Sequence, residues 1–117
     1  MIANVLVALV ALIHVYILVL EMFLWERPFG RRVFGNSVEF ARASKVLAAN
    51  QGLYNGFLAA GLVWGLSLGG GGAAVQLFFL GCVSVAGLYG AWTVAPRILL
   101  VQSLPAVIAA AAVWLTA

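Results

Sequence analysis

The sequence NQGLYNG at residues 50–56 places four amide or phenol side chains and two glycines within seven positions. Strongly apolar sequence lies on both sides of it, so we expect it to be part of a membrane-spanning helix. A polar side chain in hydrocarbon costs free energy unless it meets a partner, and such residues therefore face a bundle interior or a cavity. We predict that residues 50–56 form one wall of a small polar site.

The composition is that of a membrane protein. Of the 117 residues, 66% are hydrophobic and 8% are charged, and the mean hydropathy is +1.16. Soluble domains carry roughly 25% charged residues, so this chain cannot cover a water-facing surface. We predict a single integral membrane domain over residues 1–117. The only cysteine, Cys82, permits no internal disulfide and no cysteine-based metal site.

Four apolar stretches are each close to the roughly 20 residues that cross a bilayer. They cover residues 2–25, 46–68, 73–94 and 98–116. Two very short links, 69–72 and 95–97, join the last three stretches, and short links force neighbouring helices to be antiparallel. We therefore predict an all-α fold, an integral membrane up-down four-helix bundle.

The basic residues indicate the orientation of the bundle. The first long connection holds Arg27, Arg31, Arg32, Arg42 and Lys45, and the last short link holds Arg97. Because cytoplasmic loops are enriched in Lys and Arg, this distribution places both connections in the cytoplasm and both termini outside. The net charge of +3 is then a topology signal, and we expect no nucleic-acid partner.

The long connection is expected to contain the start of the second helix. Asn36 and Glu39 have capping-box spacing, so the helix should cover residues 37–68, about 48 Å at 1.5 Å per residue. A hydrocarbon core is only about 30 Å thick, so the first turns should project into the cytoplasm. Pro28 and Gly30 are expected to break the chain before this helix. Three residues are expected to lie toward the membrane surface: Phe34, Val38 and Ala41.

Polar residues gather in the cytoplasmic half of all four predicted helices. At 100° per residue they fall on one face of each helix, and we expect these faces to turn inward. The faces are His14, Glu21 and Trp25 on the first helix; Asn50, Tyr54, Phe57 and Gly61 on the second, with Gln51 and Asn55 beside them; Cys82, Ala86, Tyr89 and Thr93 on the third; and Gln102, Ala106, Ala109 and Val113 on the fourth. Pro105 should loosen the last helix and free a carbonyl group.

Glu21 offers the sharpest chemistry of the predicted site. Hydrocarbon disfavours an ionised carboxylate. Glu21 therefore either stays neutral or amide-bonded and fixes the helix register, or acts as a proton acceptor or ligand contact. We predict catalytic roles for Glu21, Tyr54 and Tyr89. The residues predicted to bind a ligand are His14, Trp25, Asn50, Gln51, Asn55 and Gln102.

His14 is the only histidine of the chain. It precedes Glu21 by roughly 10 Å along a helix, so the two side chains cannot bond directly. A lone histidine cannot build a zinc site, and we predict no metal site made of protein ligands alone. Two interpretations stay open: a neutral His14 bonded to a side chain of another helix, or an axial ligand to a haem iron.

Small residues recur at a spacing that lets membrane helices approach closely. Gly52-x-x-x-Gly56 and Ala86-x-x-x-Gly90 both have it, and we expect them to pack helices together. This spacing also leaves self-association of the chain open. Four tryptophans near the ends of the apolar stretches are interpreted as membrane anchors, and Trp25 could also cap the Glu21 site.

These residues together resemble the signature of a bacterial membrane protein family catalogued as domain-of-unknown-function family 1304. The resemblance covers nearly the whole chain. It rests on His14 with Glu21-Met22 and Trp25, on residues 50–56, on Ala86-Gly87-x-Tyr89-Gly90, and on Gln102-x-x-Pro105-Ala106. It implies a four-span, multi-pass protein of the bacterial cytoplasmic (inner) membrane, and it implies no activity.

The chain is also similar to styrene oxide isomerase, a small four-helix membrane enzyme that uses haem. This similarity lies in size, span number and buried His, Asn and Tyr chemistry. No motif matches, so no residue role follows from it.

Four hypotheses for function follow. The leading one is a polar intramembrane pocket that binds or transforms a small lipophilic molecule, with the lipid bilayer as surroundings. The alternatives are a haem-dependent isomerase or oxidoreductase with His14 as axial ligand, an oligomeric transport or channel subunit, and a purely structural membrane partner. The cofactor is left open, with haem as one alternative.

Overall fold

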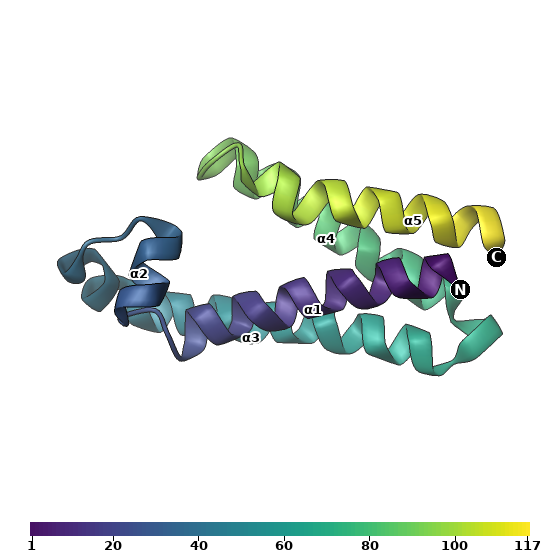
Figure 1. The fold of residues 1–117 in the computed structure, drawn as a ribbon, viewed down its shortest axis with the longest axis horizontal. Helices are drawn as coiled ribbons and strands as arrows, with labels where there is room; N and C mark the ends of the chain where they lie inside the picture. Colours follow the sequence, from purple (N-terminus) through teal and green to yellow (C-terminus); the bar gives the residue numbers. More distant parts are fainter. The chain divides into compact units, whose positions relative to one another are not determined.

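The computed structural model describes residues 1–117 and shows a chain made of helices (Figure 1). The α-helices are α1 (Ile2–Met22), α2 (Pro28–Phe34), α3 (Val38–Ser67), α4 (Ala73–Thr93) and α5 (Leu104–Thr116). A 3-10 helix, η1 (Gly69–Gly72), precedes α4, and a π-helical segment, η2 (Leu99–Ser103), precedes α5. The predicted all-α class is confirmed.

Three helical segments are long and apolar enough to cross a membrane. They are Ile2–Met22, Gly69–Thr93 and Leu99–Thr116. Helix α3, which contains the second predicted span, is not among them, since it carries the polar residues 50–56 and three charged residues before them. The chain is thus a small protein with membrane-type helices, and three of the four predicted spans meet these measures.

The helices pack as two compact units. The first unit comprises Met1–Ile13 and Leu58–Ala117, and the second comprises His14–Phe57. Helices α1 and α3 each contribute one part to each unit, whereas α4 and α5 belong to the first and α2 to the second.

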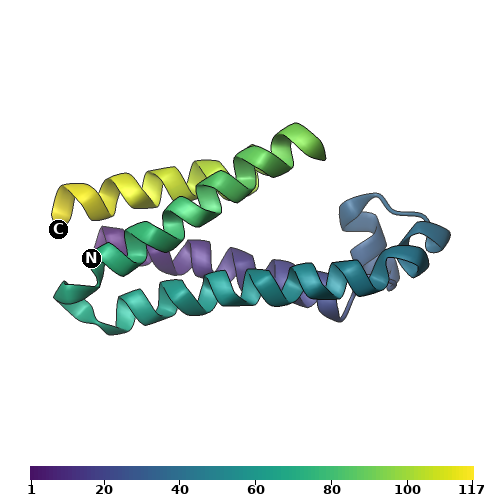
Figure 2. The same ribbon diagram turned by 180° about the vertical axis from the view of Figure 1, so that it is seen from behind.

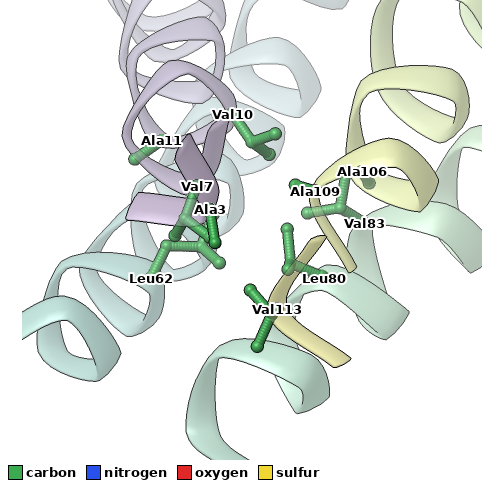
Figure 3. Packing of buried hydrophobic residues seen from close by; sticks show 10 residues of the cluster. All are labelled: Ala3, Val7, Val10, Ala11, Leu62, Leu80, Val83, Ala106, Ala109 and Val113. Atoms are coloured by element: carbon green, nitrogen blue, oxygen red, sulfur yellow. The ribbon is translucent and has the colours of Figure 1, made fainter. Parts of the chain in front are cut away.

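The core of the first unit is built mainly from alanine and valine, which let helix backbones approach closely (Figure 3). Its buried residues come from α1, α3, α4 and α5. They are Ala3, Val7, Val10, Ala11, Leu62, Leu80, Val83, Ala106, Ala109 and Val113. The inward face predicted for the last helix is confirmed for Ala106, Ala109 and Val113, which are all buried.

Helix α4 packs on η2 and α5, and the two views show α4 and α5 side by side (Figures 1 and 2). The Ser103 hydroxyl donates to the Ser84 carbonyl oxygen at 2.9 Å. Gly87 leaves the room that Ser103 occupies, because a methyl group there would collide with the Ser103 backbone nitrogen. Close contact between these helices therefore depends on one glycine and one small hydroxyl residue.

The π-helical segment lies directly before Pro105. The Leu104 N–H reaches back five residues to the Leu99 carbonyl oxygen, in place of the usual four. Proline lacks the N–H that would close a regular turn here, so the wider turn accommodates it. The predicted loosening of this helix is confirmed.

A glycine turn joins α3 to α4. Gly69 adopts a positive φ of 60°, which a residue with a side chain rarely adopts. The buried Gln76 side chain donates from Nε2 to the Gly65 carbonyl oxygen at 3.2 Å, and this bond ties the first turn of α4 to the end of α3.

The connection after α1 differs from the prediction. Pro28 does not break the chain but begins α2, because proline suits the first position of a helix, where no N–H is needed. Gly30 is buried against the Leu24 carbonyl group, so no side chain fits there. Gly35 ends the helix with a positive φ of 71°, and its N–H bonds the Arg31 carbonyl oxygen.

The start of α3 also needs a correction. The capping residue is Ser37 and not Asn36: the Ser37 hydroxyl oxygen accepts the Phe40 N–H at 3.1 Å. Of the three residues expected to lie toward the membrane surface, Val38 is exposed, whereas Phe34 is half-buried and Ala41 is fully buried. The predicted extent of this long helix is otherwise confirmed within one residue at each end.

Candidate functional site

The second unit brings together a carboxylate and an amide that are far apart in the sequence. The Asn55 side chain donates from Nδ2 to Glu21 Oε1 at 2.7 Å. Asn55 is 9% exposed, and Glu21 is partly buried. Figures 1 and 2 agree in showing the second half of α1 alongside α3, which is where this bond forms. The predicted alternative of an amide-bonded Glu21 therefore describes the structure.

Two glycines of α3 bring the helices close enough for this bond. A methyl group at Gly56 would lie 2.7 Å from Leu18 Cδ1. At Gly52 it would lie 3.1 Å from Glu21 Cβ and 3.2 Å from the Leu18 carbonyl oxygen. The predicted packing role of this glycine pair is confirmed, and it positions the Glu21 side chain as well.

An open hollow of about 380 Å³ lies beside Glu21. Its lining residues are Glu21, Met22, Phe23, Trp25, Glu26, Arg27, Lys45, Val46, Ala49 and Asn50. The Lys45 ammonium lies 3.9 Å from Glu26 Oε1, with both side chains about half exposed. The hollow therefore combines apolar walls with one partly buried carboxylate and a few charged groups at its rim.

Trp25 is held by the protein itself. Its indole nitrogen donates to the Ser44 hydroxyl at 3.1 Å, and that hydroxyl donates to the Phe40 carbonyl oxygen at 2.6 Å. Its ring lies 4.9 Å from the Phe34 ring, at an angle of 50°. These contacts fasten α2 to α3, and Trp25 still lines the hollow.

The inward face predicted for α3 is wrong for Asn50, Tyr54 and Phe57, although Gly61 of that face is buried. Tyr54 is 53% exposed and packs on Phe57, which is 58% exposed. Asn50 and Gln51 are exposed too, and the Asn50 amide donates to the Val46 carbonyl oxygen of its own helix at 2.8 Å. The buried stripe is instead Ala48, Gly52, Asn55, Ala59 and Leu62. Small residues decide which face packs, because they permit the closest approach.

His14 is completely buried. It lies on the same side of α1 as Glu21, two turns earlier, but it does not line the hollow. A haem iron could reach its ring only if the surrounding side chains moved.

Two predicted site residues belong to the first unit. Tyr89 is 64% exposed, and its ring meets Trp92 edge-on at 6.2 Å. The inward face predicted for α4 is wrong for Tyr89, Ala86 and Thr93, which are exposed; the buried residues are Gln76, Leu80, Val83 and Gly87. Gln102 is half-buried in η2. Glu21, by contrast, belongs to the second unit.

Sequence reasoning missed the residues at the rim of the hollow. Glu26, Arg27 and Lys45 were interpreted only as charges beside a span, and Ser44 was not singled out. Glu26 directly follows the first apolar stretch, and Lys45 directly precedes the second. Opposite charges at the ends of two neighbouring stretches are the pattern that could have predicted this rim.

The fold and this site define a class of protein: a small all-α chain with three membrane-type helices and a carboxylate–amide pair between α1 and α3. The chain belongs to the family described as "Protein of unknown function (DUF1304)", whose model matches residues 8–114. It is 33% identical over 103 residues to "Uncharacterized protein YpaA" of Lactococcus lactis subsp. lactis (strain IL1403). That alignment covers 86% of this chain and 87% of the relative. No solved structure matches the chain.

Proposed function

We propose that this protein binds or transforms a small lipophilic molecule in the hollow beside the Glu21–Asn55 pair. The observation that carries the proposal is the bond from Asn55 Nδ2 to Glu21 Oε1, at 2.7 Å between the membrane-type helix α1 and the long helix α3. The bond engages one carboxylate oxygen of Glu21. The other stays available to a ligand in the hollow, which Glu21 lines.

The apolar walls of the hollow favour a lipophilic ligand. Met22, Phe23, Trp25 and Val46 supply apolar surface next to the single partly buried carboxylate. Binding sites for small molecules typically combine apolar walls with a few well-placed polar groups. Glu21 would accept a hydrogen bond or a proton from the ligand, and Asn55 would hold the carboxylate in place.

Only some of the remaining predicted residues line the hollow. Asn50 and Trp25 line the same hollow and would contact the ligand directly. Gln51, Tyr54, His14, Tyr89 and Gln102 do not line it, and their roles stay predictions.

The surrounding architecture is part of the proposal. We place the chain as a single four-span domain in the bacterial cytoplasmic membrane, with both termini outside. The 30 residues of α3 span about 45 Å, so α3 is long enough to cross a hydrocarbon core and extend beyond it. Reporter fusions at each terminus test the orientation, because a fusion active only in the cytoplasm would contradict it.

Native mass spectrometry of the detergent-purified protein tests the site. We expect a small molecule to co-purify with the wild type and to be lost from Glu21→Gln and Asn55→Ala. Glu39→Gln is the matched control, since it makes the same chemical change at an exposed residue. Equal retention in Glu21→Gln and Glu39→Gln would contradict the role of Glu21, and a wild type without any bound molecule would contradict the proposal as a whole.

A further inference from the structure

A second surface of the molecule carries a different kind of chemistry. Helix α2 and the first turns of α3 expose apolar and basic side chains together. We call this the basic–apolar surface; its residues are Phe29, Arg32, Val33, Val38 and Arg42, all of them exposed. A turn of three residues joins α2 to α3, so the two parts lie next to each other (Figures 1 and 2).

Packing fixes which side of α2 is exposed. Gly30 lies against the Leu24 carbonyl group, and the Phe34 ring lies 4.9 Å from the Trp25 ring. Phe29 and Val33 are four residues apart on another face of the helix, and they are 47% and 40% exposed. The chain itself therefore leaves this apolar pair uncovered at the end of an apolar helix.

The charges of this region are unbalanced. Residues 27–45 hold five cations and one acid, Glu39. Two of the cations contact Glu26. Arg31 Nε donates to the Glu26 carbonyl oxygen at 3.2 Å, and the Lys45 ammonium lies near the Glu26 carboxylate. The exposed side chains of Arg32 and Arg42 have no such partner. They are available to an anionic group.

We propose that the basic–apolar surface docks on anionic lipid headgroups at the face of the membrane. Helix α2 begins only six residues after the end of α1, so it lies close to where an apolar span ends. Exposed apolar side chains interleaved with arginine are the pattern of elements that lie in the membrane interface. Arg32 and Arg42 would pair with lipid phosphates, while Phe29 and Val33 would enter the headgroup region.

This surface differs from the hollow beside Glu21, and the inference stands independently of the function proposed there. A soluble anion would explain the arginines but not the two apolar side chains beside them. A nucleic acid would likewise leave Phe29 and Val33 without a partner.

The test uses the full chain in lipid nanodiscs. Discs are made from zwitterionic phosphatidylcholine mixed with anionic phosphatidylglycerol, and native mass spectrometry measures which lipid stays bound to the ejected protein. We expect the wild type to retain phosphatidylglycerol preferentially. The double variant Arg32→Gln/Arg42→Gln should lose this preference by about fivefold per cation removed, and Phe29→Ser should weaken it as well.

Three controls make the outcome decisive. Arg97→Gln removes an exposed arginine from another connection and should leave the preference unchanged. Arg32→Lys/Arg42→Lys keeps the charges and should restore the preference even if the glutamine variant folds poorly. An undiminished preference in the glutamine variant, or an equal loss in Arg97→Gln, would overturn the proposal. Displacement of the lipid by millimolar inorganic phosphate would overturn it in favour of a soluble anion.

Discussion

Helices meet in two different ways in this molecule. In the first unit, α4 packs on η2 and α5 through alanine, valine and one glycine, and the Ser103 hydroxyl donates to a backbone oxygen of α4. In the second unit, α1 and α3 also approach through small residues, Gly52 and Gly56. Here, however, a partly buried carboxylate bonds a buried amide between them.

The difference bears on function. The contact of Gly87 with Ser103 brings two helices close together without a buried charge. A carboxylate placed between helices adds a desolvation cost that the packing does not require. Under the proposed function, chemistry at the hollow accounts for this cost. The predictions that follow test this contrast, beginning with the largest expected effect.

Filling the space at Gly52 should disrupt the second unit. Gly52→Leu would press a side chain against Met22 and the Leu18 carbonyl oxygen, and we expect a loss of about 2–3 kcal/mol in unfolding free energy. Unfolding in mixed micelles of detergent and SDS measures it. Gly81→Leu is the matched control, because nothing lies within 4 Å of its added Cβ. Equal losses in both variants would show that the Gly52 contact is not tight.

Removing the amide should cost less but remain clear. Asn55→Leu leaves the Glu21 carboxyl group partly buried without its donor, and we expect a loss of about 1–2 kcal/mol. A double-mutant cycle with Glu21→Leu isolates the pair, since the double variant should lose less than the sum of the single variants. Strict additivity would mean that the bond contributes nothing.

The polar contact of the first unit should matter less. Ser103→Ala removes the bond to the Ser84 carbonyl oxygen but keeps the small side chain that Gly87 accommodates, so we expect a loss of about 0.6 kcal/mol. The same unfolding assay applies. A loss larger than that of Asn55→Leu would reverse the contrast drawn between the two units.

Trp25 should act on local order more than on global stability. Trp25→Phe keeps the ring on Phe34 but deletes the bond to the Ser44 hydroxyl. We expect α2 to open more often, and trypsin to cleave at Arg31 and Arg32 several-fold faster while the unfolding free energy falls by less than about 1 kcal/mol. Unchanged cleavage would show that this bond does not hold α2 in place.

The smallest change in unfolding free energy is expected at Asn50, five residues before Asn55. Asn50→Ala removes an exposed amide whose bond is to its own helix, and we expect a change within about 0.5 kcal/mol. The comparison with Asn55→Leu distinguishes an amide that bonds its own helix from one that bonds a neighbouring helix. A large loss for Asn50→Ala would mean that its face is covered, as it would be in an oligomer.

Composition and apolar runs predicted the helices well. Hydrophobic stretches reveal the lengths of membrane-type helices, and the ends of α3 followed from turn-forming residues on either side. Hydropathy alone does not make α3 a span, because its polar and charged residues keep its hydropathy below that of the other long helices.

The inward faces were harder to predict. The sequence argument turned every polar face inward, which succeeded for His14 but failed for Tyr54 and Tyr89. Asn50 satisfies its amide on its own backbone, and the position of glycine determines which side of α3 packs. Helix α2 was not predicted, because Gly30 was interpreted as a break in the chain. Its actual role is a close contact with the Leu24 carbonyl group, which no local sequence pattern reveals.

The π-helical segment before Pro105 also bears on how the family can tolerate length changes. Residues 99–103 contain one residue more than regular α-helical turns would need, so they act as an insertion absorbed within a helix. Deleting one residue there would restore regular winding and leave the residues on either side facing as they do now. Relatives that lack this residue should therefore keep Ala106, Ala109 and Val113 on the packing face.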